Sequence, residues 1–364
     1  MTEPVTLPSK DASVEQRLML RNFRDRTYLS DEQAPYHGVS HPDVVWEKAQ
    51  ILIERCAHYG IPVDGEALRN AIDTHDALSH IPSRLLGYDS AERVASILTY
   101  HFLIGCGYSE AAARKSSDIV MATNPDVRPT TPEEIIIRAA DLWNIGSHYH
   151  EFKAASLALH REAMNTARLE LPFNSWIRGS FGYLTKFLWP MLELTPECRD
   201  AQGRSTWHTN AIRNLSTLWR ETFGEETPVV AELFPYGDAK PTMPVKAFYI
   251  AIHPDETVRQ GSIGGLSSAA SAQQGAAFSV PGERGAFPIP DETCDRVICH
   301  EASFESLREA LRVTRRGGVI SLDFREKLDP KVLEVAKLFP FAISNLSSES
   351  EELRTLVIQK ELFV

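Results

Sequence analysis

The sequence lacks any long hydrophobic run. No stretch of about 18 or more consecutive apolar residues occurs, which is the least that a helix needs to cross a bilayer. The first residues are polar and do not contain the apolar segment of a secretory signal peptide. We therefore expect this chain of 364 residues to be cytoplasmic and to have no membrane as a partner.

Basic residues are in deficit, since 38 lysines and arginines stand against 49 aspartates and glutamates, for a net charge of -11. A protein that binds DNA or RNA without regard to sequence needs a basic face, so that class is not expected. A nucleotide ligand remains compatible with this charge, because a bound metal ion supplies positive charge locally.

Cysteine is scarce, with five residues scattered along the chain. An odd number of scattered cysteines suits a reducing compartment rather than a disulfide framework. Cys294 and Cys299 flank one expected strand, and without further ligands such a pair is typical of buried apolar surface rather than of a metal site.

Histidine and aspartate occur where three helical segments would otherwise carry apolar residues. His37 and His41 are four residues apart, so on a helical turn they share one face. His75 continues an apolar stripe at helical spacing, and Asp141 interrupts the apolar stretch 135–145. A lone carboxylate in such a helix is costly unless it is paired or bound to a cation. Imidazoles and carboxylates from separate helices therefore predict a divalent metal site.

Each of these residues also has a structural alternative. A buried histidine with satisfied hydrogen bonds explains His75, and an ion pair with Arg138 explains Asp141. His41 can be a residue of a polar helix start, and His37 can be a solvent-facing residue of a turn. The sequence leaves both interpretations open.

The order His…His-Asp…Asp resembles the HD superfamily of metal-dependent phosphohydrolases over roughly residues 31–222. The Tyr-His-x-x-x-His segment from Tyr36 to His41 is similar to HD phosphohydrolases and, more distantly, to cyclic-nucleotide phosphodiesterases. The resemblance implies a divalent cation (Mn, Fe, Mg or Zn), with His37 as the general acid. The residues that it implies as metal ligands are His41, His75, Asp76 and Asp141.

The resemblance also implies an activity, the hydrolysis of a phosphate ester or phosphoanhydride of a nucleotide or small metabolite. The cation would polarise the phosphoryl oxygen and lower the pKa of a water molecule. Asp76 or Asp141 would orient this water, and His37 would protonate the leaving oxygen.

Four further residues are weaker candidates. His80 and His101 could contribute to a second metal site; the alternatives are a loop residue and a residue within an aromatic core. Lys115 and Arg138 could bind the substrate phosphate, but such residues commonly are solvated or form local ion pairs.

The pattern of the chain changes near residue 224. We expect an N-terminal tail with a short helix (1–30), an all-α HD-type helical bundle (31–224) and an α/β Rossmann-like domain (225–364). Residues 260–286 are rich in Gly, Ser, Ala and Gln and predict a loop or weak helix. Strands alternating with helices predict a mostly parallel sheet. The expected strands are 229–234, 247–252, 293–299, 319–324, 341–346 and 353–360.

Residues 287–299 and 309–322 resemble the fourth strand, the following helix and the fifth strand of class I S-adenosylmethionine-dependent methyltransferases. The resemblance spans roughly residues 228–364 and implies Glu232, Gly237 and Glu283 as cofactor contacts.

The glycines that this family uses to bring backbone amides close to the cofactor are missing, because Leu233-Phe234-Pro235-Tyr236 follows Glu232. We therefore expect a degenerate domain without S-adenosylmethionine that serves as a lid, an interface or a sensor.

Two other functions remain alternatives. In one, the C-terminal half is a working methyltransferase and the helical half is a scaffold. In the other, the protein senses or regulates through a bound nucleotide without catalysis. A homo-oligomer is compatible with either, and the expected partner is a small phosphate-bearing molecule.

Overall fold

The computed structural model of the chain describes residues 14–168, 170–184, 194–233, 244, 246–253, 273–282, 285–300, 302–324, 328–348 and 351–360. The chain divides into two compact units. The helical unit comprises Met1–Leu171 and Met191–Cys198, and the sheet unit comprises Pro172–Pro190 and Arg199–Val364. Among the described residues, no helix is both long and apolar enough to cross a membrane.

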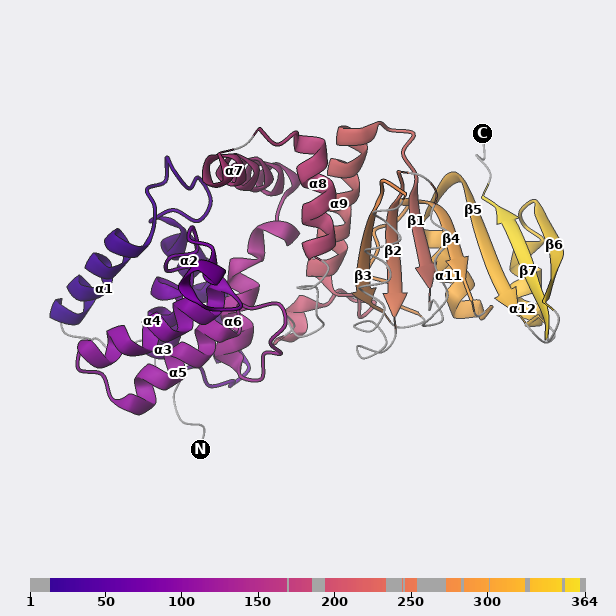
Figure 1. Cartoon of the computed structure of the whole chain (residues 1–364). Coiled ribbons are helices and arrows are strands. Elements are labelled where there is room, and N and C mark those ends of the chain that lie inside the picture. Colours follow the sequence, from indigo (N-terminus) through magenta and orange to yellow (C-terminus); the bar gives the residue numbers. More distant parts are fainter. Residues whose placement is uncertain are drawn as a thin grey trace. The chain divides into compact units, whose positions relative to one another are not determined.

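The helical unit confirms the predicted all-α N-terminal region (Figure 1). Its helices are α1 (Val14–Thr27), α2 (His41–His58), α3 (Gly65–Thr74), α4 (Ala91–Gly105), α5 (Glu110–Met121), α6 (Pro132–Asp141) and α7 (Tyr149–Ala167). Short 3-10 turns are η1 (Ser83–Leu86), η2 (Trp143–Gly146) and η5 (Pro196–Cys198).

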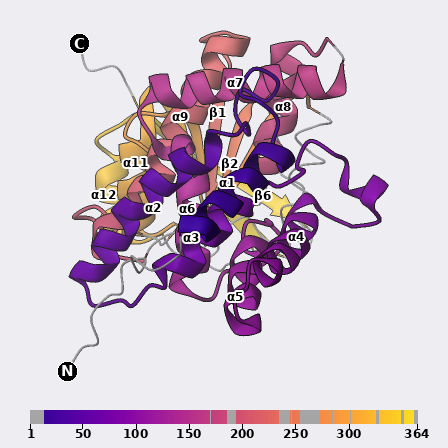
Figure 2. The ribbon, with the colours of Figure 1, turned by 90° about the vertical axis from the view of Figure 1, so that its left-hand side faces the viewer.

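Helix α3 lies at the centre of this unit, in contact with α1, α2, α4, α5 and α6. Leu68, Ala71 and Ile72 of α3 are fully buried among these helices. Figure 2 shows α4 and α5 running side by side. The carboxyl end of α3, which carries His75 and Asp76, is therefore held from several directions.

Local sequence signals set the start of α6, as predicted. The Thr131 side chain accepts the backbone N–H of Glu134, and the Glu134 carboxylate accepts the backbone N–H of Thr131. Pro132 is the first helical residue, where its missing N–H costs nothing. This capping box fixes the register in which Asp141 ends the helix.

The sheet unit confirms the predicted α/β class. Its helices are α8 (Phe173–Leu184), α9 (Thr206–Phe223), α11 (Phe304–Val313) and α12 (Pro330–Ala336). Its strands are β1 (Val229–Leu233), β2 (Phe248–His253), β3 (Ala276–Pro281), β4 (Cys294–Cys299), β5 (Thr314–Phe324), β6 (Phe341–Ser348) and β7 (Glu351–Gln359).

The strand order is β3-β2-β1-β4-β5-β7-β6 (Figure 1). The first five strands are parallel, and β7 runs antiparallel between β5 and β6. This is the methyltransferase-like Rossmann arrangement with its closing hairpin. The order in which the chain adds strands reverses between β1 and β4, and open α/β sheets commonly bind ligands at such a place, at the carboxyl ends of their strands.

The boundary between the units differs from the prediction at residue 225. Helices α8 and α9 belong to the sheet unit. Phe181 of α8 and Trp219 of α9 contact the ring of Phe248 on β2, with ring centroids 5.6 and 6.1 Å apart. Two helices that the helical pattern alone assigned to the N-terminal region therefore cover the sheet.

One strand was not predicted. Strand β3 lies inside residues 260–286, which were expected to form a loop or weak helix. Its residues Ala276–Val280 are all buried, so the alternation of polar and apolar residues that marks a half-exposed strand is absent. A Cβ at Gly275 would stand 2.5 Å from the carbonyl oxygen of Ala247, so glycine permits the close approach of β3 to the segment that leads into β2.

Candidate metal centre

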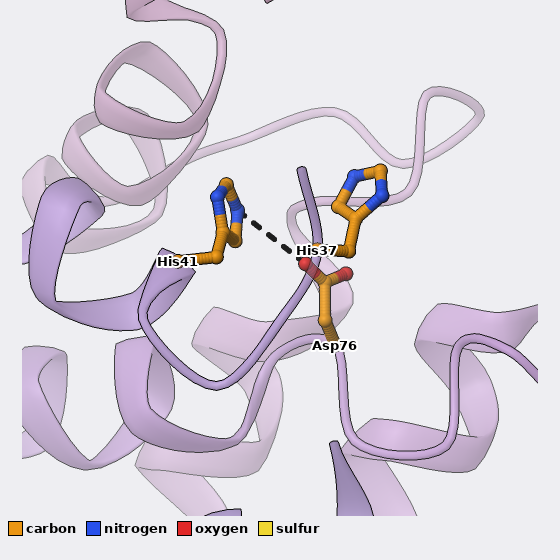
Figure 3. A group of neighbouring side chains, drawn as sticks. All are labelled: His37, His41 and Asp76. Atoms are coloured by element: carbon orange, nitrogen blue, oxygen red, sulfur yellow. Dashed lines mark ion pairs between the residues drawn. The ribbon is translucent and has the colours of Figure 1, made fainter. Parts of the chain in front are cut away.

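Three helix ends bring the predicted metal ligands together. His41 is the first residue of α2, His75 directly follows α3, and Asp141 is the last residue of α6. Asp76 lies in the turn after α3, and Figure 3 shows its carboxylate pointing toward His41, with His37 close by. Residues as far as 100 positions apart in the chain thus meet at one point.

The distances within this group match those around a shared cation. Nε2 of His41 lies 3.1 Å from Oδ1 of Asp141 and 3.5 Å from Oδ2 of Asp76. Nε2 of His75 lies 3.0 Å from Oδ2 of Asp76 and 3.7 Å from Oδ1 of Asp141. Ligand atoms about 2.0–2.2 Å from one ion stand roughly 3–3.6 Å apart in tetrahedral or octahedral geometry. We call these four residues the His/Asp centre.

The hydrogen bonds of His75 define which of its nitrogens faces the centre. Its Nδ1–H donates to the carbonyl oxygen of Ile72 at 2.8 Å, and a carbonyl can only accept. Nε2 of His75 and Oδ2 of Asp76 are buried and lie 3.0 Å apart, without the geometry of a hydrogen bond. A backbone bond to Nδ1 that leaves Nε2 for the metal is the usual state of a ligating histidine. This placement of the His75 and Asp76 side chains fits a divalent cation.

Charge in the His/Asp centre is balanced between its members. Burial lowers the pKa of His75, but the negative charges of Asp76 and Asp141 outweigh it and raise that pKa well above its ordinary value. Burial raises the pKa of each carboxyl group, but His75 beside Asp76 and His41 beside Asp141 lower both below the usual range. A divalent cation would take over the role of the protons on the histidines.

His37 is not a solvent-facing residue. Its Nδ1 lies 2.7 Å from Oε1 of Glu162 on α7, and its side chain is 30% exposed. Burial lowers the pKa of His37, but Asp76 and Glu162 raise it to about 9. A nitrogen of His37 lies within 4.8 Å of ligand atoms of His41 and Asp76. His37 therefore borders the His/Asp centre as a cationic donor at neutral pH.

Glu162 was not identified from the sequence. Its Oε2 accepts the backbone N–H groups of Tyr36 and His37 at 3.0 and 2.9 Å, in addition to the bond from the His37 ring to Oε1. A separation of 125 residues from His37 leaves no spacing signal in the sequence. The carboxylate holds both the backbone and the ring of His37 in place.

Arg138 is placed differently from both predictions. Its Nε donates to the carbonyl of Ala122 and its Nη2 donates to the carbonyls of Asn124 and Val127. The side chain is 1% exposed. Arg138 therefore holds the segment after α5 in place, and the carboxylate of Asp141 is hydrogen-bonded to His41.

Lys115 is likewise engaged locally. Its ammonium group donates to carboxylates of Asp64 and Glu133 at 3.0 and 3.1 Å. These contacts tie α5 to the starts of α3 and α6, which agrees with the structural alternative. Neither Lys115 nor Arg138 is placed by the structure as a phosphate ligand of the His/Asp centre.

The second-metal candidates do not join the centre. Among the described residues, the groups of side chains whose ligand atoms lie within 4.8 Å of one another contain neither His80 nor His101. His80 is half-buried in the loop after α3, and His101 is exposed beside the ring of Tyr100. His80 therefore lies in a loop, as its alternative has it, whereas His101 is exposed and does not lie within the aromatic core that was its alternative.

The sheet unit contains a separate polar cluster at the carboxyl ends of its strands. Nε2 of His300, the residue after β4, donates to Glu232 at 2.5 Å, and its Nδ1 donates to Asp323 at 2.8 Å. The Thr355 hydroxyl donates to the other oxygen of Asp323 at 2.7 Å. Burial lowers the pKa of His300, but the two carboxylates raise it to about 9. We call Glu232, His300 and Asp323 the carboxylate clamp.

One of the three predicted cofactor contacts, Glu232, is a member of the clamp. Glu232 is present at the end of β1 as predicted, but its carboxylate is engaged by His300. Gly237 and Glu283, the other two predicted contacts, lie outside the described residues, as do Phe234 and Pro235. The prediction that the domain does not bind S-adenosylmethionine remains a prediction.

Comparison with known proteins finds similarity in the C-terminal part of the chain, at low identity. A protein of Pyrococcus horikoshii is 14% identical, with 46% of this chain and 97% of that chain covered and a TM-score of 0.28. A SAM-dependent methyltransferase of Methanosarcina mazei is 12% identical (39% and 96% covered, TM-score 0.28). A [4+2]-cyclase is 12% identical (45% and 86% covered, TM-score 0.31).

No family model matches the chain, and no curated protein matches it. The assignment of the sheet unit to the methyltransferase-like Rossmann class therefore relies on its own strand order. The chain as a whole is a helical unit joined to such a sheet.

Proposed function

We propose that the protein is a metal-dependent phosphohydrolase whose reaction takes place at the His/Asp centre. The observation that carries the proposal is that Nε2 of His41 and Nε2 of His75 both lie 3.0–3.7 Å from carboxylate oxygens of Asp76 and Asp141. Withdrawing imidazoles and carboxylates from water is costly, and a cation shared by these residues would offset that cost. The substrate class is a phosphate ester or phosphoanhydride of a nucleotide or small metabolite.

The residues of the centre divide the chemical work. His41, His75, Asp76 and Asp141 would hold the ion, which supplies Lewis acidity and a more acidic water. Asp76 and Asp141 each have a second carboxylate oxygen to orient that water and accept its proton. His37, held by Glu162 and bordering the centre, donates a proton to the leaving oxygen.

The decisive experiment compares metal content and hydrolysis in matched proteins. Protein purified without chelator is expected to contain about one equivalent of a transition metal, by analogy with other closed His/carboxylate sites. The double variant His75→Ala/Asp76→Ala is expected to lose the metal and all hydrolysis in a screen of phosphomonoesters, phosphodiesters and nucleotides supplemented with Mn²⁺, Fe²⁺, Mg²⁺ or Zn²⁺.

His101→Ala is the matched control, because this histidine is exposed and lies outside the ligand groups. It is expected to keep both metal and activity. A double variant that retains full metal content and full hydrolysis would reject the proposal. Reconstitution with Mg²⁺ before assay guards against an ion lost in purification.

A second candidate is methyl transfer by the sheet unit, which the strand order favours. A fold of this type hosts many unrelated activities, so the strand order alone does not define the chemistry. Engagement of Glu232 by His300 favours a structural use of the strand ends instead. Calorimetric titration of the full chain with S-adenosylmethionine separates the candidates: we expect no heat of binding, and saturable binding would favour methyl transfer.

A further inference from the structure

We propose that helix α1 and the residue after it belong to the metal centre, with Arg24, Thr27 and Tyr28 acting as positioning residues for the segments that carry His41 and Asp76. This inference rests on the proposed function of the same centre. The sequence had placed these residues in an N-terminal tail outside the helical bundle. Their contacts reach the turn after α3 and the first turn of α2.

The carboxyl end of α1 accepts hydrogen bonds from two backbone N–H groups of the turn that contains Asp76. The backbone N–H of Asp76 donates to the hydroxyl oxygen of Tyr28 at 3.0 Å. The backbone N–H of Leu78 donates to the carbonyl of Thr27 at 3.0 Å. Two consecutive residues, Thr27 and Tyr28, therefore anchor the backbone on both sides of Ala77.

This turn is strained, and the anchors explain why it persists. Leu78 has φ of 62°, a left-handed conformation that costs a residue with a side chain roughly 1–2 kcal/mol. Such conformations survive where the surroundings impose them, and they occur often at functional sites. Here the reversal directs the chain away immediately after Asp76, so that its carboxylate faces the His/Asp centre.

The other contact of α1 joins the two ligand-bearing helices. Arg24 donates to the carboxylate of Asp43 at 3.0 Å and to that of Asp73 at 3.3 Å, and it also donates to the carbonyl of Val39. Asp43 follows His41 by two residues, and Asp73 precedes His75 by two. One guanidinium group, 12% exposed, thus links the start of α2 to the end of α3.

Helix α1 otherwise packs lightly. Leu20 is the buried residue among those of α1 whose burial is described, and Leu18 is 57% exposed. The hold of α1 on the centre is therefore concentrated in a few polar contacts at its carboxyl end. Removing one of these polar contacts should displace the metal ligands without disturbing the apolar packing among α2, α3, α5 and α6.

Tyr28→Phe tests this, because it removes the hydroxyl group and keeps the buried ring. Mn²⁺ affinity is measured by calorimetry on the full chain after removal of metal with a chelator. We expect the variant to bind Mn²⁺ at least about tenfold more weakly than wild type, the effect typical of losing a group that orients a ligand. Its unfolding temperature should stay close to that of wild type.

Tyr59→Phe is the matched control. Its hydroxyl also forms a hydrogen bond within the helical unit, here as the donor to the carboxylate of Glu197 at 2.7 Å, and both residues lie outside α3 and the turn that follows it. The control should keep wild-type affinity. Equal Mn²⁺ affinity in Tyr28→Phe and wild type would overturn the positioning role.

Hydrogen exchange at the Asp76 amide gives a readout that needs no metal. In metal-free protein this amide should exchange at least about tenfold faster in Tyr28→Phe than in wild type, because its acceptor is gone. A wild type that binds no Mn²⁺ rejects the proposed centre, and the positioning role with it. Normal binding with unchanged exchange rejects only the role of Tyr28.

Discussion

Each of the two units contains histidine near two carboxylates, but the ring nitrogens of these histidines are directed differently in the two clusters. In the carboxylate clamp, both nitrogens of His300 have carboxylate acceptors on opposite sides of the ring. In the His/Asp centre, the Nε2 atoms of His41 and His75 both face the carboxylates of Asp76 and Asp141, at 3.0–3.7 Å. Every ring nitrogen of the clamp therefore has an acceptor, whereas the centre has the geometry that we propose for binding a cation.

This difference shows that composition does not identify a metal site. A metal site requires one lone pair from each residue directed to the same volume. A linear arrangement of carboxylate, imidazolium and carboxylate uses the same residue types, but its ligand atoms do not point to a common position where an ion could bind. Among the described residues, the sets of converging ligand atoms come from the helical unit and do not include the clamp.

The largest expected effect comes from Asp141→Asn, which removes a negative charge from the His/Asp centre. Mn²⁺ affinity should fall by at least about 100-fold, beyond the range seen for residues that only support a ligand, and hydrolysis should be lost. Calorimetry measures the affinity. Asp323→Asn makes the same change in the clamp and should leave metal binding unaltered; if it weakens binding equally, the distinction between the clusters is wrong.

Substitutions in the clamp should instead change the free energy of unfolding. His300→Ala leaves Glu232 and Asp323 close together with no cation between them. Breaking a buried ion pair costs roughly 3–5 kcal/mol, and because the His300 side chain is 19% exposed we expect about 2–3 kcal/mol from urea unfolding. The triple variant Glu232→Gln/His300→Ala/Asp323→Asn should recover much of this loss. Unchanged stability of His300→Ala would contradict a structural role.

Glu162→Gln probes the edge of the His/Asp centre. The amide oxygen can still accept from the backbone, but the charge that helps to keep His37 protonated is gone. We expect hydrolysis to fall by about tenfold and the alkaline limb of the pH–rate profile to move to lower pH. Glu197→Gln, in the same unit and paired with Tyr59, should change neither. Metal content should be normal in both variants.

The smallest expected effect is a pH dependence specific to the clamp. The pKa of His300 is raised to about 9 in the folded protein, against roughly 6.5 in an unfolded chain. Its contribution to stability is therefore fully present below about pH 6.5 and is lost as the pH rises through about 9. The difference in unfolding free energy between wild type and His300→Gln should shrink over that window. A difference that is constant from pH 6 to 10 would argue against an imidazolium.

Much of the local structure could be predicted because its causes are local. Thr131, Pro132 and Glu134 specify the start of α6 within four residues, and apolar spacing places His75 at the end of a helix. The all-α region followed by a mostly parallel sheet came from the same kinds of pattern. A divalent metal site was also predicted from the positions of these histidines and aspartates on helical segments, and the exact set of four ligands came through a family resemblance.

The parts that the sequence did not indicate depend on contacts between distant segments. Glu162 meets His37 across 125 residues, and Tyr28 meets Asp76 across 48. Strand β3 is buried on both faces, so it has no alternating pattern, and α8 and α9 look like any amphipathic helix until Phe181 and Trp219 meet Phe248.

The sequence by itself determined where elements such as α6 begin and which side chains have the chemistry of metal ligands, because capping, periodicity and side-chain chemistry act over a few residues. Only the tertiary structure decided which histidine keeps an unused nitrogen. His75 and His300 are both imidazoles near two carboxylates, and the direction of each ring relative to those carboxylates is set by packing. That direction separates a candidate metal centre from an internal ion bridge.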